Sequence, residues 1–163
     1  SSTGSSVRSP RTRRLLRIEH TALAHTILTQ SPMISHTFLG VHDFDRALRF
    51  YRALFAAMGI SERFCNPDRP WAGWQSDPGP RPLFLIGRPY DQQAHHPGNG
   101  QMIALLASTR EIVDRAYAVA NATGATDEGA PGLRPDYHPN YYGAYFRDSE
   151  GNKLCVVCHN APG

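Results

Sequence analysis

The sequence lacks any run of 18 or more apolar residues, which excludes a transmembrane helix. It has only three cysteines in 163 residues. This scarcity argues against a disulfide framework and favours a reducing, cytoplasmic setting. The chain is not rich in charge either: charged residues make up 19% of it, against 40% hydrophobic residues. That balance and length are typical of one globular domain with a buried core.

Most of the chain also lacks a net positive charge. Residues 1–32 hold five arginines and one acidic residue, whereas the rest of the chain holds 12 basic and 13 acidic side chains. The net charge of +3 therefore comes from the leading segment, and the folded part has no basic excess for binding nucleic acid. We interpret residues 1–32 as a basic leader or a cloning-derived segment outside the core, although their composition is also similar to that of a transit peptide.

From Met33 onward the sequence contains two copies of one unit. Residues 33–41 predict a strand, Asp43 is placed as the N-cap of an amphipathic helix, and Gly59 ends that helix. The same order returns 66 residues later, with a strand predicted at residues 101–107. There the helix is capped by Thr109 and closed by Gly124.

Short strands follow each helix. Alternation and turn residues predict them at Ile60–Cys65, Trp71–Gln75, Leu83–Gly87, Tyr142–Arg147 and Lys153–His159, with a weaker one near Ala125–Glu128. Because Trp71 and Trp74 are three residues apart on one strand, we expect them on opposite faces. The sequence therefore predicts an α+β fold of two βαβββ modules. Module one covers 33–88, a linker 89–100 and module two 101–160, within one domain at 33–160.

Two stretches resemble a known family. Residues 34–43 (ISHTFLGVHD) and 46–51 (RALRFY) resemble the opening strand and helix of the vicinal-oxygen-chelate superfamily of glyoxalases, bleomycin resistance proteins and dioxygenases. Residues 145–155 (YFRDSEGNKLC) resemble the F-x-D-P-x-G-N-x-x-E signature that closes a module of that family. The resemblance covers nearly all of 33–160 and implies that the modules form a cupped mixed sheet.

In that family, side chains from the first, fourth, fifth and eighth strands hold a divalent metal. His36 falls on the strand-one ligand position, but the repeat offset places Met102 in strand five, Cys155 replaces the closing Glu, and Leu85 aligns with Cys155 in strand four. One imidazole with two sulfur atoms suits copper(I) or weakly held zinc rather than magnesium, manganese or non-haem iron. Met102 and Cys155 suit apolar packing equally well. We therefore expect a degenerate site, with His36 as its remaining ligand, and either no cofactor or one divalent metal ion.

Cys155 takes part in two further patterns. Residues 155–159 (CVVCH) match the c-type haem attachment motif, but on a strand Cys155 and Cys158 point to opposite faces, so we expect neither haem nor zinc at this pair. Cys155 is also a candidate nucleophile, activated by His36 across the cup. A buried cysteine that acts only in packing is the simpler interpretation.

Residues 129–142 (GAPGLRPDYHPNYY) form the stretch most typical of a binding loop. Between its Pro and Gly residues it carries aromatic and hydrogen-bonding side chains suited to a small polar-aromatic ligand, namely Arg134, Tyr137, His138 and Tyr141. A cover for a sheet edge or a dimer contact explains the same composition equally well. His138 is also a candidate acid–base group or replacement metal ligand.

These features predict a glyoxalase-like protein that acts on or binds a small organic molecule in a cup lined by His36, Phe38, Met102 and Cys155. If it is an enzyme, the resemblance implies lyase, isomerase or dioxygenase chemistry. One alternative is a metal-free protein that sequesters a drug or metabolite, as the bleomycin resistance branch does. Another is a metal-dependent lyase or dioxygenase with a rebuilt metal site. By family analogy we expect a homodimer with a small-molecule ligand, and no nucleic-acid or membrane partner.

Overall fold

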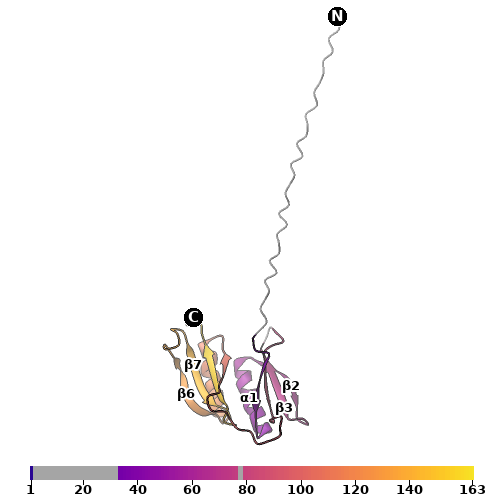
Figure 1. Ribbon diagram of the computed structural model, residues 1–163. Helices are drawn as coiled ribbons and strands as arrows, with labels where there is room; N and C mark the ends of the chain where they lie inside the picture. The colour runs from indigo at the N-terminus through magenta and orange to yellow at the C-terminus, as the bar shows by residue number, and fades with distance from the viewer. Residues whose placement is uncertain (2–32, 77–78) are drawn as a thin grey trace. The chain divides into compact units, whose positions relative to one another are not determined.

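The computed structural model describes residues 1, 33–76 and 79–163, so the interpretation of the leading segment lies outside the described residues. From Met33 onward the order β-α-β-β-β occurs twice (Figure 1). The first module consists of β1 (His36–Gly40), α1 (Phe44–Met58), β2 (Ser61–Asn66), β3 (Trp71–Gln75) and β4 (Leu83–Gly87). The second consists of β5 (Ile103–Leu106), α2 (Arg110–Ala122), β6 (Thr126–Leu133), β7 (Tyr142–Arg147) and β8 (Lys153–Cys158). The predicted α+β fold of two βαβββ modules is confirmed.

Each module forms its own four-stranded mixed sheet, in the orders β1-β4-β3-β2 and β5-β8-β7-β6. In each sheet the first strand of the module is parallel to the last, and the remaining pairs are antiparallel. Phe38 lies opposite Leu85, and Ala104 lies opposite Cys155. Leu85 is therefore the structural counterpart of Cys155, as the sequence alignment of the two modules predicted.

Both helices begin and end where the sequence predicts. The Asp43 carboxylate accepts a hydrogen bond from the Arg46 backbone N–H at 3.0 Å, and Thr109 Oγ1 accepts one from the Ile112 N–H at 3.4 Å. These side chains satisfy N–H groups that the first helical turn leaves unpaired. Gly59, with φ of 74°, ends α1 in the left-handed conformation that glycine adopts without strain.

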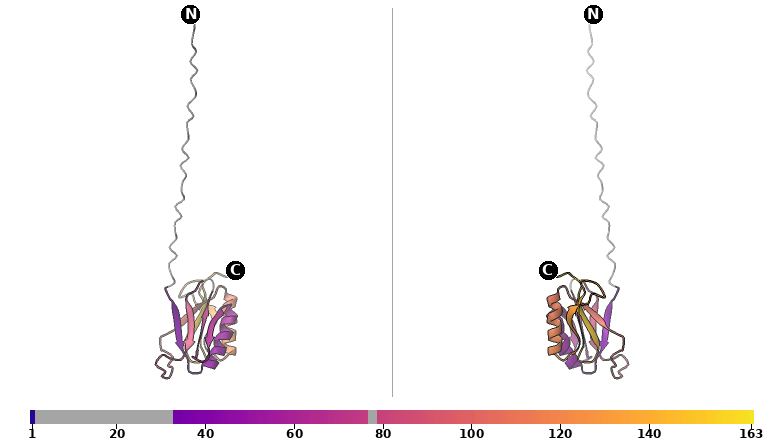
Figure 2. Two further views of the ribbon diagram at one scale, coloured as in Figure 1. Left: turned by 90° about the vertical axis from the view of Figure 1, so that its right-hand side faces the viewer. Right: turned by 90° about the vertical axis from the view of Figure 1, so that its left-hand side faces the viewer.

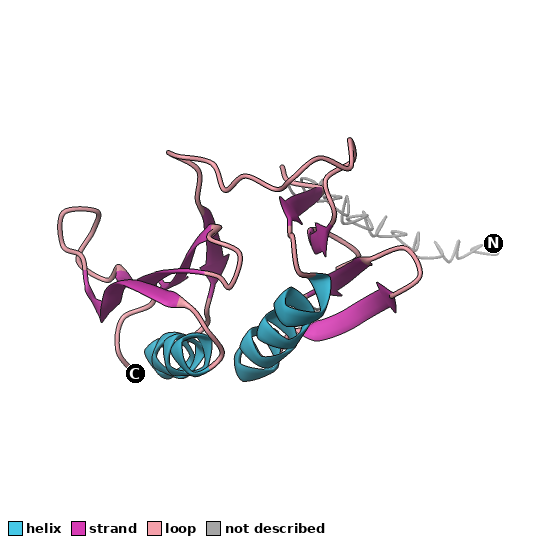
Figure 3. Cartoon of the chain, turned by 90° about the horizontal axis from the view of Figure 1, so that it is seen from below, coloured by secondary structure: helices cyan, strands magenta, loops and turns pink. Residues whose placement is uncertain are grey.

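The two helices lie next to each other on the same side of the sheets (Figures 2 and 3). Arg115 Nε of α2 donates a hydrogen bond to the carbonyl oxygen of Ala57 in α1 at 2.8 Å. One hydrophobic core fills the space between the helices and the two sheets. Trp74 is 1% exposed in this core, whereas Trp71 is 37% exposed on the opposite face. The prediction that they face opposite ways is confirmed.

Strand β6 corrects the sequence interpretation of residues 129–142. The weak strand expected near Ala125–Glu128 continues to Leu133, so the first five residues of the predicted loop are strand. Its pairing with β7 is irregular, with register shifts on both sides of Gly129. Glycine and proline have low strand propensity, which hid this strand from a pattern-based reading. The true loop begins at Arg134, whose N–H donates to the Tyr141 carbonyl at 2.8 Å.

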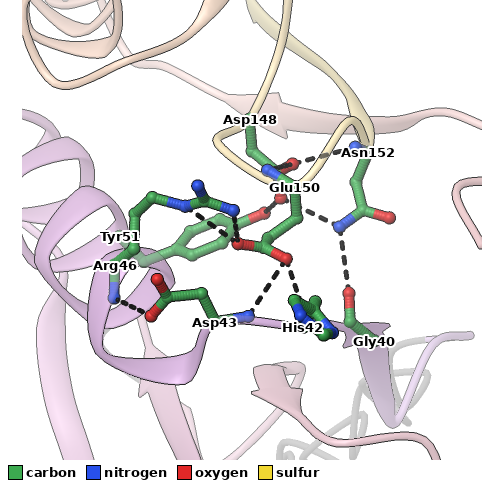
Figure 4. Close-up of polar contacts among 8 residues, drawn as sticks. All are labelled: Gly40, His42, Asp43, Arg46, Tyr51, Asp148, Glu150 and Asn152. Carbon is green, nitrogen blue, oxygen red and sulfur yellow. Dashed lines mark hydrogen bonds and ion pairs between the residues drawn. The ribbon is translucent and has the colours of Figure 1, made fainter. Parts of the chain in front are cut away.

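A polar network joins the two modules between the end of β1 and the turn that connects β7 to β8 (Figure 4). We call it the inter-module clasp; its members are Gly40, His42, Asp43, Arg46, Tyr51, Asp148, Glu150 and Asn152. At its centre Asp148 is 3% exposed and accepts a 2.5 Å hydrogen bond from Tyr51 Oη. Burial, reinforced by the neighbouring Asp148, raises the pKa of Tyr51 well above its ordinary value. The phenol therefore stays protonated and keeps donating.

The rest of the clasp ties β1 and α1 to the β7–β8 turn. The side-chain amide of Asn152 donates to the Gly40 carbonyl at 3.2 Å. The Glu150 carboxylate accepts from the backbone N–H groups of His42 and Asp43 and forms a 2.8 Å ion pair with Arg46. The closing signature of module two therefore also holds the two modules together.

Neither helix in the described part of the chain has the length and apolar character that spanning a membrane requires.

Candidate functional site

Each sheet packs one face against the helices, and no helix covers its other face (Figure 3). We call the helix-free face of β1-β4-β3-β2 the first face, and that of β5-β8-β7-β6 the second face. Strand alternation places His36, Phe38 and Trp71 on the first face, where Phe38 is 46% exposed. Large aromatic side chains are thus presented to solvent by a rigid sheet.

The first face and the segments beside it border a solvent-open cavity of about 580 Å³, which we call the first-face cavity. Its lining consists of His36, Phe38, Asp68, Arg69, Pro70, Trp71, Gly87, Arg88, Tyr90 and Gln92. The volume lies within the range of about 300–1,000 Å³ that is usual for small-molecule sites. The cavity combines aromatic surface with a few charged groups, as such sites commonly do.

Residues of all four strands of the first sheet shape the floor of this cavity. Trp71 of β3 packs on Phe64 of β2 with ring centroids 4.5 Å apart, which fixes the indole. Gly87 of β4 lies between the side chains of Trp71 and Phe38. A Cβ at Gly87 would be 3.1 Å from the Trp71 Cβ and 3.2 Å from the Phe38 Cζ. The missing side chain therefore lets the Trp71 and Phe38 side chains approach the strand closely.

The second face carries a chain of hydroxyl and thiol groups. Tyr145 Oη donates to Tyr141 Oη at 3.1 Å, and Tyr141 Oη lies 3.7 Å from Cys155 Sγ. Burial raises the pKa of the Cys155 thiol, although hydrogen bonds from the two tyrosines oppose this. A fully buried, protonated thiol is a poor nucleophile. His36 lines the cavity of the other sheet, so the structure gives no support to its activation of Cys155.

Two histidines border the same face. The Asn140 N–H donates to His138 Nδ1 at 3.2 Å, which places the proton of a neutral His138 on Nε2. That proton is donated to His159 Nδ1, 2.8 Å away. Tyr137 is 67% exposed and packs on Tyr141 with ring centroids 4.8 Å apart.

The structure divides the eight residues predicted to line a pocket between the two faces. His36 and Phe38 line the first-face cavity. Met102 lies immediately before β5 and lines a smaller crevice of about 140 Å³ together with Phe38. The other five lie in or beside the second face: Arg134, Tyr137, His138, Tyr141 and Cys155.

Sequence reasoning missed several side chains of these sites. Arg69 lies in the β2–β3 turn, and Arg88 and Tyr90 follow β4, so no single motif connects these three. Tyr145 and His159 were missed on the second face. Strand pairing places Tyr145 opposite Cys155, a signal that alternation along β7 alone does not supply.

The four positions where the family resemblance implies metal ligands are His36, Leu85, Met102 and Cys155. Register confirms Leu85 as the fourth-strand member, and its side chain has no donor atom. No group of three or more His, Cys, Asp or Glu residues in the described part of the chain is arranged to hold a metal ion. One imidazole and two sulfur atoms do not suit the hard or borderline divalent cations that catalyse lyase and dioxygenase reactions. These residues do not fit the family's metal.

The first four residues of the CVVCH segment belong to β8, and its two cysteines are buried on opposite faces of the strand. Cys155 faces Tyr141 on the second face, whereas Cys158 belongs to the core under the helices. All three cysteines of the chain are free. This geometry cannot present both thiols to one haem.

Comparison with known proteins agrees with the fold. The Glyoxalase/Bleomycin resistance protein/Dioxygenase superfamily matches residues 33–156. A glyoxalase/bleomycin resistance protein from Albidiferax ferrireducens T118 is 33% identical, with a TM-score of 0.70 over 78% of this chain and 99% of that chain. A lactoylglutathione lyase from Agrobacterium tumefaciens is 22% identical, with a TM-score of 0.54 over 80% of this chain and 95% of that chain, and shares the fold. No curated protein matches the chain.

Proposed function

The chain belongs to the Glyoxalase/Bleomycin resistance protein/Dioxygenase superfamily, and we propose that it binds a small organic molecule in the first-face cavity without a metal at the superfamily's ligand positions. The observation that carries this proposal is the cavity itself, about 580 Å³ in volume and lined by Phe38, Trp71 and Tyr90. Tyr90 is 99% exposed and Phe38 46%, so their rings have free surface for a ligand. Covering that surface removes apolar area from water, which is favourable.

The residues at the four metal-ligand positions favour ligand binding over metal-dependent catalysis. Lyase and dioxygenase reactions of this superfamily use a divalent metal that imidazole and carboxylate groups hold. Leu85 and Met102 occupy two of the four positions here, and neither offers an oxygen or nitrogen donor. We therefore propose the metal-free binding of a drug-like molecule or metabolite, and assign no reaction.

Truncating Trp71 tests this proposal. Isothermal titration calorimetry with 2-naphthamide, a neutral bicyclic probe, measures the affinity of the wild-type chain and of Trp71→Ala. We expect the substitution to weaken binding by about tenfold or more, because it removes one of the aromatic side chains that would contact the probe. Phe38→Ala should act in the same direction.

Tyr137→Ala serves as the matched control. Tyr137 is an exposed aromatic residue on the second face, and it should leave the affinity for 2-naphthamide unchanged. Equal affinity of wild type and Trp71→Ala would show that the first-face cavity is not the binding site. Weaker binding in Tyr137→Ala alone would move the site to the second face.

We also propose that a second copy of the chain covers part of the helix-free faces in a homodimer. Met102 is 44% and Leu106 71% exposed; Met102 lies immediately before β5 and Leu106 is its last residue. Clustered apolar exposure of this kind is typical of protein interfaces. Sedimentation equilibrium gives the mass of the particle, and a mass equal to one chain at micromolar concentration would contradict the proposal.

We place the protein in the cytoplasm, because its three cysteines are free and two of them are fully buried. Free thiols are typical of proteins kept in reducing compartments. Cell fractionation tests this placement, and recovery of the protein outside the cytoplasmic fraction would contradict it.

A further inference from the structure

The lining of the first-face cavity has more positive than negative charge. It includes two basic residues, Arg69 and Arg88, but only one acidic residue, Asp68. Arg69 lies in the tight turn between β2 and β3, where its backbone N–H donates to the Asn66 side chain at 3.1 Å. Arg88 directly follows β4. Two separate elements thus bring positive charge to the same cavity.

Neither guanidinium is neutralised within the described part of the chain. The ion pairs found there involve Arg46, Arg52, Arg147 and Lys153. Arg88 also borders a neighbouring hollow that contains Asp43 and Asp45, yet it forms no ion pair with either carboxylate. Both arginines therefore retain their hydrogen-bond donors for a ligand.

The charged groups lie beside an apolar floor. Phe38 and Trp71 come together over Gly87, as described above, and Trp71 is held in place by Phe64. Such a cavity suits a molecule with two ends, a planar apolar body on the aromatic floor and an anionic group against the arginines. A guanidinium presents a planar set of donors that matches the two oxygens of a carboxylate or phosphate.

We propose that the first-face cavity takes a small organic anion, a carboxylate or phosphate carried on a planar apolar body, and that Arg69 and Arg88 select its charge. This inference rests on the proposed function, because it names the class of molecule that the same cavity binds. Phe38 and Trp71 bind the apolar body, so they set affinity for charged and neutral ligands alike. Arg69 and Arg88 set the difference in affinity between charged and neutral ligands.

Three matched probes test the inference: 2-naphthoate, its neutral isostere 2-naphthamide, and 2-naphthyl phosphate. Calorimetry on the wild-type chain should show 2-naphthoate binding about tenfold or more tightly than 2-naphthamide, since charge-assisted hydrogen bonds add to the same apolar contact. Arg69→Gln combined with Arg88→Gln should abolish this preference, because it weakens the binding of 2-naphthoate much more than that of 2-naphthamide. Tighter binding of 2-naphthyl phosphate than of 2-naphthoate would identify a phosphorylated ligand. Tighter binding of 2-naphthoate would identify a carboxylic acid. Either result supports the proposal.

Arg49→Gln is the control for loss of one positive charge, because Arg49 is exposed on α1 and lies outside the cavity lining. It should keep the full preference for the anion. If wild type binds 2-naphthoate and 2-naphthamide equally and Trp71→Ala weakens both, the proposed function stands and the anionic class is wrong. If neither probe binds, the proposed function fails at this cavity and the inference fails with it. A preference that survives the double arginine variant overturns the role of Arg69 and Arg88.

Discussion

Replacing Asp148 with alanine is expected to lower the free energy of unfolding by about 3–5 kcal/mol, because it removes the centre of the inter-module clasp. Asp148 is 3% exposed and accepts four hydrogen bonds, from the Tyr51 phenol, the Glu150 N–H and two groups of Asn152. Alanine would leave these buried donors unpaired, and each of them was desolvated on folding. Thermal unfolding should show the Tm lowered by roughly 10–15 °C.

Two further variants show whether the loss comes from the clasp. Tyr51→Phe removes one donor and leaves Asp148 with its others, so we expect a smaller loss of about 1–2 kcal/mol. Asp136→Ala removes an exposed carboxylate without a hydrogen bond among the described residues, and it should change stability by less than about 0.5 kcal/mol. An Asp148→Ala protein as stable as Asp136→Ala would contradict the clasp as a major link between the modules.

Trp74→Ala and Trp71→Ala should have opposite consequences, although the two residues share one short strand. Trp74 is 1% exposed, with its ring centroid 5.2 Å from that of Phe55 and 5.9 Å from that of Tyr51. Truncating it leaves a large core cavity, and we expect a loss of about 3–5 kcal/mol. Trp71→Ala should cost less than about 1 kcal/mol of stability, because its indole lies on the first face.

Urea unfolding measures the loss of stability in Trp74→Ala, and titration with 2-naphthamide measures the loss of affinity in Trp71→Ala. The fraction of Trp74→Ala that remains folded should bind 2-naphthamide with the affinity of wild type. Trp71→Ala should lose affinity for the probe and nearly keep its unfolding midpoint. A destabilised Trp71→Ala with unchanged binding would mean that the indole serves packing rather than ligand contact.

Much of this fold was predictable because its signals are local. The helical spacing after Asp43 and Thr109 is a property of short segments, and both caps form as expected. Strand alternation likewise separated Trp71 from Trp74, since side-chain direction along a strand repeats every two residues. The part of β6 beyond Glu128 escaped prediction, because Gly129 and its neighbours have low strand propensity and this part is defined by pairing with β7.

The candidate site was less predictable, because it depends on contacts between distant segments. His36 and Phe38 were recognised from their own strand and from the family resemblance. Arg69 and Arg88 were not, since a turn and a strand end become neighbours only in the folded sheet. The role of Glu150 was hidden for the same reason: its partner Arg46 is 104 residues away in the sequence.

This chain has the superfamily's fold and a ligand-sized cavity, and we propose that it binds no metal at the superfamily's ligand positions. The most direct measurement is metal content per chain, by elemental analysis of protein purified without chelators, incubated with excess nickel, zinc or manganese, and then desalted. We expect well below one metal ion per chain, the same for wild type and His36→Ala. Close to one metal ion per chain that disappears in His36→Ala would contradict it and restore a metal-dependent lyase or dioxygenase.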